Sequence, residues 1–128
     1  MIEITAELIK DFLNDIDIKL VSTHNRLSLP VIKRIYKKMK YGIKFDEIKI
    51  CDHLVIDGHH RYLSSLLAQI EIGTIKTLKT SATKEYKWDE VEFDENDWDT
   101  NHKIQYLNEK DAAYNELDVE IVNRIISE

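Results

Sequence analysis

The fold of this chain is decided by one short stretch, Leu54-Val55-Ile56-Asp57-Gly58-His59-His60-Arg61-Tyr62. Val55 and Ile56 are β-branched and suit a strand, and the glycine that follows Asp57 permits a sharp turn. Residues 62–68 then have the apolar spacing of one helix face. The unpaired amides and the positive dipole end of such a helix favour an anion, above all a phosphate, at the end of the strand.

Outward from this stretch, hydrophobic periodicity and capping residues predict an alternation of helices and strands. The predicted elements are a helix over 5–14, a strand over 16–22, a helix from 29 to about 42, strands over 45–50 and 54–56 joined by a turn at 51–53, a helix over 62–69, a strand over 72–78, a strand over 86–93, an acidic loop over 94–100, and two or three helical pieces over 101–126 with breaks near Asn108 and Asp118. Thr5 and Ser28 are the expected N-caps of the first two helices. We therefore predict one α+β domain over residues 1–128, with no linker.

Composition agrees with one folded domain. The chain has 128 residues, of which 43% are hydrophobic, enough for a real core. Its longest apolar runs are too short to span a bilayer, and its first residues lack the pattern of a signal peptide. Cys51 is the single cysteine and has no partner for a disulfide, so we expect a cytoplasmic protein with no membrane partner.

The net charge of −6 is unevenly distributed. Residues 1–80 carry 13 basic and 10 acidic side chains, whereas residues 81–128 carry 5 basic and 14 acidic ones. An acidic second half repels a phosphate backbone, so direct DNA binding is not expected. The basic cluster at 33–40 is interpreted as a solvated helix face.

Residues 29–75 resemble the core of the ParB/sulfiredoxin superfamily: a helix ending at a glycine, two short strands around a turn, Ile-Asp-Gly-His-His-Arg opening a helix, and a further strand. The resemblance covers about residues 16–80 and implies a small mixed sheet with flanking helices, here followed by an acidic strand, loop and helical extension over 81–128. The turn at 57–61 looks like that of the free serine kinases on this fold. In ParB proteins the matching turn binds nucleotide phosphates, so the implied ligand is a nucleotide such as ATP, ADP or CTP, with Mg²⁺ as a companion ion.

Departures from the family narrow the implied activity. Sulfiredoxins place their catalytic cysteine where this chain has His59, so reduction of that type is set aside. A partition role is not expected, because the 48 residues after Thr80 are too few and too acidic for a DNA-binding segment. The kinases also use a carboxylate from an earlier region, and the segment 24–26 at that place contains none. A nucleotide-dependent phosphotransferase or NTPase is the implied enzyme, with turnover left open.

Each residue of the motif has a role in this hypothesis. Gly58, His59 and His60 present backbone N–H groups to a phosphate, and Arg61 clamps its oxygens. Asp57 serves as general base or as a ligand to Mg²⁺, and one of the two histidines stabilises developing negative charge. The simpler alternative is that Asp57 only caps the helix and the histidines lie on the surface. No protein metal site is expected, because His53 and the paired histidines lack further ligands at supporting spacing.

The acidic second half supports a different class of function. Trp88, Phe93 and Trp98 lie among seven carboxylates between residues 89 and 99, a composition suited to binding a basic protein. The alternative is that Trp88 and Phe93 belong to the core and only Trp98 reaches the surface. The second hypothesis is thus a non-catalytic immunity or antitoxin type of module that engages a basic partner through 88–99.

Overall fold

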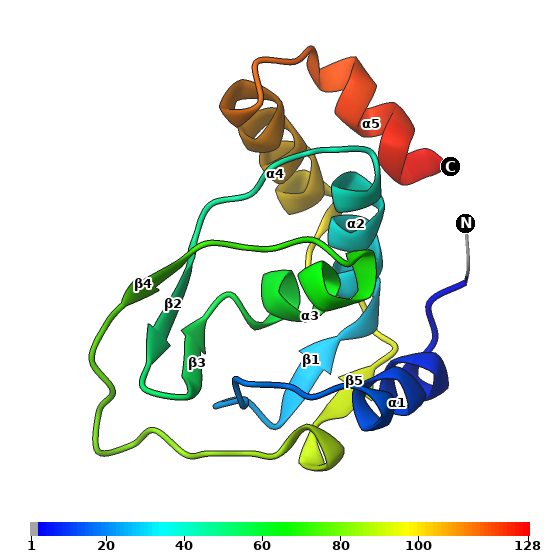
Figure 1. Cartoon of the computed structure of the whole chain (residues 1–128). Coiled ribbons are helices and arrows are strands. Elements are labelled where there is room, and N and C mark those ends of the chain that lie inside the picture. Colours follow the sequence, from blue (N-terminus) through cyan, green and yellow to red (C-terminus); the bar gives the residue numbers. More distant parts are fainter. Residues whose placement is uncertain (1–2) are drawn as a thin grey trace.

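The computed structural model describes residues 3–128, in which helices and short strands alternate along the chain (Figure 1). The elements are α1 (Ala6–Asp15), β1 (Arg26–Ser28), α2 (Leu29–Lys40), β2 (Ile48–Cys51), β3 (Leu54–Asp57), α3 (His59–Ala68), β4 (Thr74–Lys76), the 3₁₀ turn η1 (Trp88–Glu90), β5 (Glu92–Asp94), α4 (Asn101–Tyr114) and α5 (Val119–Ser127). This is the α+β class that the sequence predicts.

Within residues 3–128 the strands form two small sheets. In the larger one the order is β3-β2-β4, with β2 antiparallel to β3 and parallel to β4. In the smaller one β1 runs parallel to β5, so that residues 26–28 lie beside residues 92–94. Val21 covers the outer edge of β3 by exchanging backbone hydrogen bonds of 2.8–2.9 Å with His53 and Val55. Because β2 is the central strand, β4 lies at the opposite edge of the larger sheet.

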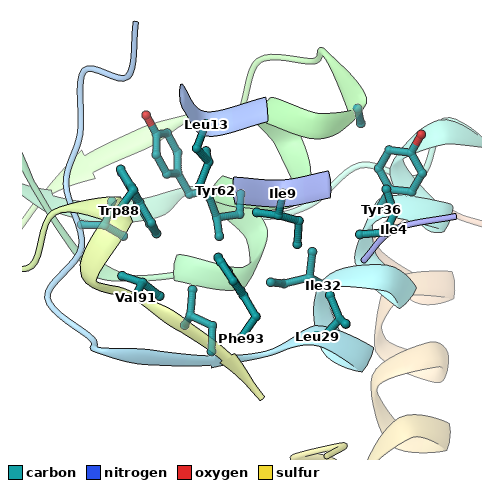
Figure 2. Packing of buried hydrophobic residues seen from close by; sticks show 14 of the residues in the cluster. Ile4, Ile9, Leu13, Leu29, Ile32, Tyr36, Tyr62, Trp88, Val91 and Phe93 are labelled. Carbon is teal, nitrogen blue, oxygen red and sulfur yellow. The ribbon is translucent and has the colours of Figure 1, made fainter. Parts of the chain in front are cut away.

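One apolar core joins the first three helices to both sheets and to η1 (Figure 2). Its most deeply buried members are Ile9, Leu27, Leu29, Ile32, Ile48, Val55, Leu63 and Val91. Each side chain of this kind contributes about 1.5–3 kcal/mol when it is removed from water. Helices α2 and α3 pack directly against each other, which fixes the start of α3 relative to β1.

Several predicted elements are confirmed. Thr5 caps α1, its Oγ1 accepting a hydrogen bond of 3.0 Å from the Leu8 amide. The expected hairpin is present as β2 and β3, and its turn contains Asp52 at a φ of +53°. Helix α2 admits Pro30 in its first turn and ends just before Gly42. Strand β4 lies inside the predicted 72–78 but is shorter.

The predicted strand over 16–22 is wrong. Its alternation is real, because Ile16, Ile18 and Leu20 pack against the core. However, only Val21 and Ser22 reach a neighbour, through isolated bridges to β3 and to Tyr86. The segment is extended chain laid over the core, since side-chain alternation alone does not supply a neighbouring strand.

The predicted strand over 86–93 is also wrong as one element. The segment divides into a bridge at Tyr86, the turn η1 and the short strand β5. Trp88 and Phe93 are buried core residues at 6% and 9% exposure, whereas Trp98 is 47% exposed, as the core alternative predicts. The tight turn at η1 lets both rings reach the core.

The C-terminal extension forms two helices, and the predicted break near Asn108 is wrong. Asn108 is buried in the middle of α4, where its Nδ2 donates to Asn123 Oδ1 at 2.9 Å. The break at Asp118 is confirmed, because that residue is the N-cap of α5. Figure 1 shows α4 and α5 at the end of α2 that is remote from β1.

The basic face of α2 contacts acidic residues, contrary to the expectation of a solvated face. Arg34 pairs with two carboxylates of the 94–99 loop, and Lys38, with a side chain 5% exposed, pairs with Asp111 of α4 at 2.7 Å. Lys37 donates to the Glu128 carbonyl at the end of the chain. Basic side chains of the first half of the chain therefore pair with acidic side chains of the second half within the molecule. No helix between residues 3 and 128 is long and apolar enough to cross a membrane.

Candidate anion site at the start of helix α3

The Asp-Gly turn connects the end of β3 to α3. Gly58 is the N-cap of the helix and has a φ of +97°, a left-handed conformation that favours glycine. A Cβ at this position would lie 2.6 Å from Ile48 Cγ2 of the neighbouring strand and 2.9 Å from Nη2 of Arg61. Glycine is required here for both reasons, the backbone angle and the close packing.

Among residues 3–128, no side chain caps the first turn of α3. The first backbone bond of the helix runs from the Tyr62 amide to the Gly58 carbonyl at 2.8 Å, so the preceding amides have no acceptor within the helix. The capping role considered for Asp57 is therefore wrong: its side chain is 64% exposed and faces Arg61 instead. Free amides at the start of a ten-residue helix are the donors that an anion needs.

The His59 imidazole lies inside the protein, with the residue only 2% exposed. Its Nε2 accepts a hydrogen bond of 3.1 Å from the Thr23 amide, so the ring hydrogen is on Nδ1. Burial, reinforced by the neighbouring His24 and His60, lowers the pKa of His59 to about 3. At neutral pH this ring is an uncharged acceptor that fastens the segment before β1 to the start of α3.

His60 makes the corresponding contact one residue later. Its Nε2 accepts a hydrogen bond of 2.9 Å from the Ser28 amide, and the Trp98 ring meets it edge-on at 5.5 Å between centroids. Burial lowers the pKa of His60 to about 4, against the opposing effect of Asp99. His60 thus holds β1 and His59 holds the segment before it, each through a backbone amide, and they are not the surface residues of the simpler alternative.

Arg61 folds back across the turn. Its Nη1 donates to the carbonyls of Asp46 and Glu47 at 2.8 and 3.0 Å, which holds the loop before β2 against α3. Its Nη2 lies 3.6 Å from Asp57 Oδ2, beyond hydrogen-bond range and close to Gly58. Nη1 therefore holds the loop in place, whereas Nη2 faces the turn with N–H donors that form no hydrogen bond among residues 3–128.

The structure adds His24, which spacing gave no reason to place at this site. Its ring is exposed and stacks on His59, with centroids 3.9 Å apart and planes 15° from parallel. The contact spans 35 sequence positions, so no local pattern could reveal it. The only available signal was that His24 belongs to the segment 24–26, which the family resemblance places near the site.

The acidic loop over 94–99 lies beside this cluster and is fastened to the basic half. Arg34 holds Asp97 through two hydrogen bonds of 2.5 and 2.8 Å, and it contacts Asp99 at 3.2 Å. The Arg34 hydrogen bond lowers the pKa of Asp97, and the Trp98 indole N–H lowers that of Asp94 in the same way. Fewer carboxylates are free for a basic partner than the sequence suggests, and binding of such a partner stays a prediction.

Two further findings limit where a ligand can bind. Between residues 3 and 128, no group of three or more His, Cys, Asp or Glu side chains is placed to hold a metal ion, and His53 pairs instead with Glu85 at 2.8 Å. A shallow hollow of about 300 Å³ lies between α1 and η1, against Leu13 and Trp88, and contains none of the candidate residues. This hollow is therefore separate from the start of α3.

Comparison with known proteins found no matching family model, no matching curated protein and no matching solved structure. The class that fold and site define is an α+β domain with an uncapped helix start that carries one buried and one half-buried histidine.

Proposed function

We propose that this protein binds the phosphate group of a small molecule, in particular a nucleotide, at the start of α3. The observation that carries the proposal is the uncapped first turn of α3 after Gly58, with the Nη2 of Arg61 beside it. Free helix amides and a guanidinium together match the oxygens of a phosphate in geometry and in charge. No side chain of the described residues competes for these amides.

The resemblance to the ParB/sulfiredoxin superfamily supports the nucleotide part of the proposal. The Asp-Gly-His-His-Arg turn follows an antiparallel hairpin and opens a helix, and a parallel strand comes after it, the order expected from that resemblance. ATP, ADP and CTP are the ligands to test first, each with and without Mg²⁺.

In this proposal the motif residues divide into two groups. Gly58 and the amides of His59 and His60 bind the phosphate together with Arg61, while the exposed Asp57 carboxylate is the group available as general base or as a Mg²⁺ ligand. The two imidazoles are neutral acceptors that position β1 and the segment before it beside the site. Because their pKa values lie far below 7, proton donation by either is a demanding role at neutral pH, and it is tested separately from binding.

The test measures binding of ATP, ADP, CTP, GTP and inorganic phosphate, with and without Mg²⁺, by thermal shift and then by calorimetry. A ligand at about 100 times its Kd should stabilise the folded state by about 2.7 kcal/mol. Arg61→Ala should weaken binding at least about tenfold, since it removes a charged donor pair. Arg124→Ala, which removes an exposed arginine from α5, is the matched control and should bind as the wild type does.

Because Arg61 also holds the loop before β2, the variant must first be shown to fold by its circular dichroism and its unfolding midpoint. A folded Arg61→Ala protein that binds as tightly as wild type overturns the assignment of the site. Absence of any shift with all five ligands overturns the proposed function. ATP or CTP consumption by the wild type that is lost in Asp57→Asn, with binding retained, would support turnover.

A further inference from the structure

Strand β4 has one open edge. On its inner side, Ile48 N–H donates to the Gly73 carbonyl at 2.9 Å, and Thr77 N–H donates to the Ile50 carbonyl at 2.8 Å. Successive peptide groups of a strand point to alternate sides, so those of Thr74 and Lys76 point away from β2. Within residues 3–128 no strand lies on that outer side (Figure 1).

The side chains of β4 are as exposed as its edge. All three residues of the strand are exposed, Ile75 at 43%, and Leu78 just beyond the strand is 87% exposed. A strand normally buries at least one face, and an exposed edge with unpaired N–H and C=O groups is a template for pairing with another chain. Two large apolar side chains beside free backbone donors and acceptors therefore indicate a surface that is covered when a partner is bound.

The charge of this edge selects the partner. Lys76 is the last residue of β4, Lys79 follows three residues later, and Lys49 of β2 is paired in register with Ile75. None of these lysines forms an ion pair with any residue between 3 and 128. A second copy of this chain would bring lysines against lysines, and like charges placed opposite each other in a sheet are destabilising. An acidic strand would satisfy the same lysines.

We propose that the open edge of β4 binds an extended acidic segment of another protein, which adds to the sheet as a further strand. Backbone hydrogen bonds to Thr74 and Lys76 would provide affinity, Ile75 and Leu78 would pack against apolar residues of the partner, and the lysines would set its charge. This surface is separate from the start of α3 and does not depend on the proposed phosphate site.

The test uses amide hydrogen exchange with a synthetic peptide of alternating valine and glutamate. At a concentration about ten times its Kd, the peptide should slow exchange of the Thr74 and Lys76 amides about tenfold. The exchange of Ile75, whose amide points toward β2, should change far less. A peptide of alternating valine and lysine, which has the same strand propensity and the opposite charge, should have no effect.

Lys76→Pro removes an outward N–H without removing a hydrogen bond of the sheet, and Lys76→Gln removes the charge while keeping the N–H. We expect the proline variant to lose peptide binding and the glutamine variant to retain it at reduced affinity. No protection by the acidic peptide at about 1 mM, or equal protection by both peptides, overturns the proposal. Protection that appears without peptide and grows with protein concentration identifies a second copy as the occupant and also overturns it.

Discussion

The buried His59 and the half-buried His60 predict a steep loss of stability between neutral pH and pH 5. The perturbation is protonation: each imidazole is uncharged in the folded protein and accepts a backbone N–H, so a proton on Nε2 would break that bond and place a charge in the interior. In the unfolded chain both rings titrate near their ordinary pKa of 6.5, whereas folding lowers the pKa to about 3 for His59 and about 4 for His60.

The sign and the size of the effect follow from these values. Below pH 6.5 the unfolded state binds more protons than the folded state, so the free energy of unfolding falls as the pH falls. The stabilisation is fully present above pH 6.5 and is lost as the pH falls toward the pKa values of the two histidines in the folded protein. From pH 7 to pH 5, each histidine should cost about 2 kcal/mol, and the pair about 4 kcal/mol, with a limiting slope of about 2.7 kcal/mol per pH unit.

The assay is urea denaturation at pH 7, 6 and 5, for wild type, for the double variant His59→Asn/His60→Asn and for His102→Asn. The double variant should lose most of the pH dependence between 7 and 5, although it is less stable at pH 7. The control removes an exposed histidine from α4 and should keep the wild-type slope.

If the double variant is too unstable to measure, the imidazole signals of the folded wild type provide a direct test by NMR. Both rings should remain unprotonated at pH 5. Titration of both rings near pH 6.5 in the folded protein would refute the reasoning. So would a double variant whose free energy of unfolding depends on pH as steeply as that of His102→Asn.

Two further predictions concern the turn and the contact between α2 and α4. Gly58→Ala should lower the free energy of unfolding by about 2–4 kcal/mol, because the new Cβ would collide with Ile48 and the backbone has a positive φ. Gly42 also has a positive φ, +88°, but has open space around it, so Gly42→Ala should lower the free energy of unfolding by only about 1 kcal/mol in the same denaturation assay. Lys38→Met should lower the free energy of unfolding by about 2 kcal/mol, because the half-buried Asp111 carboxylate loses its cation. The double variant Lys38→Met/Asp111→Leu should regain part of that loss, and equal stability of the single and double variants would contradict a pairing role.

Local signals predicted much of this fold, and the errors share one physical cause. The Thr5 cap, the hairpin around Asp52 and the break at Asp118 each depend on neighbouring residues, and each is confirmed. Alternation over 16–22 correctly indicated which side chains face the core, but it overestimated the strand, because a strand also needs a neighbour to pair with. Over 86–93 one unbroken alternation would place Trp88 and Phe93 on opposite faces, whereas both are buried, because η1 interrupts the segment between them. The pairing of β1 with β5 joins residues 66 positions apart, and no local pattern contains it.

For the candidate site, the sequence by itself determined the strand, the glycine turn and the helix start over 54–62, because these follow from backbone preferences of adjacent residues. Only the tertiary structure decided what the side chains do. The packing of α2 against α3 places His59 and His60 against β1 and the segment before it, where both rings are uncharged. The stacking of His24 on His59 adds a residue to the cluster, and Arg34 binds the acidic loop that the sequence offered to a partner. Burial, ionisation and ion pairing depend on residues brought together from distant parts of the chain, so they are fixed only when the chain has folded.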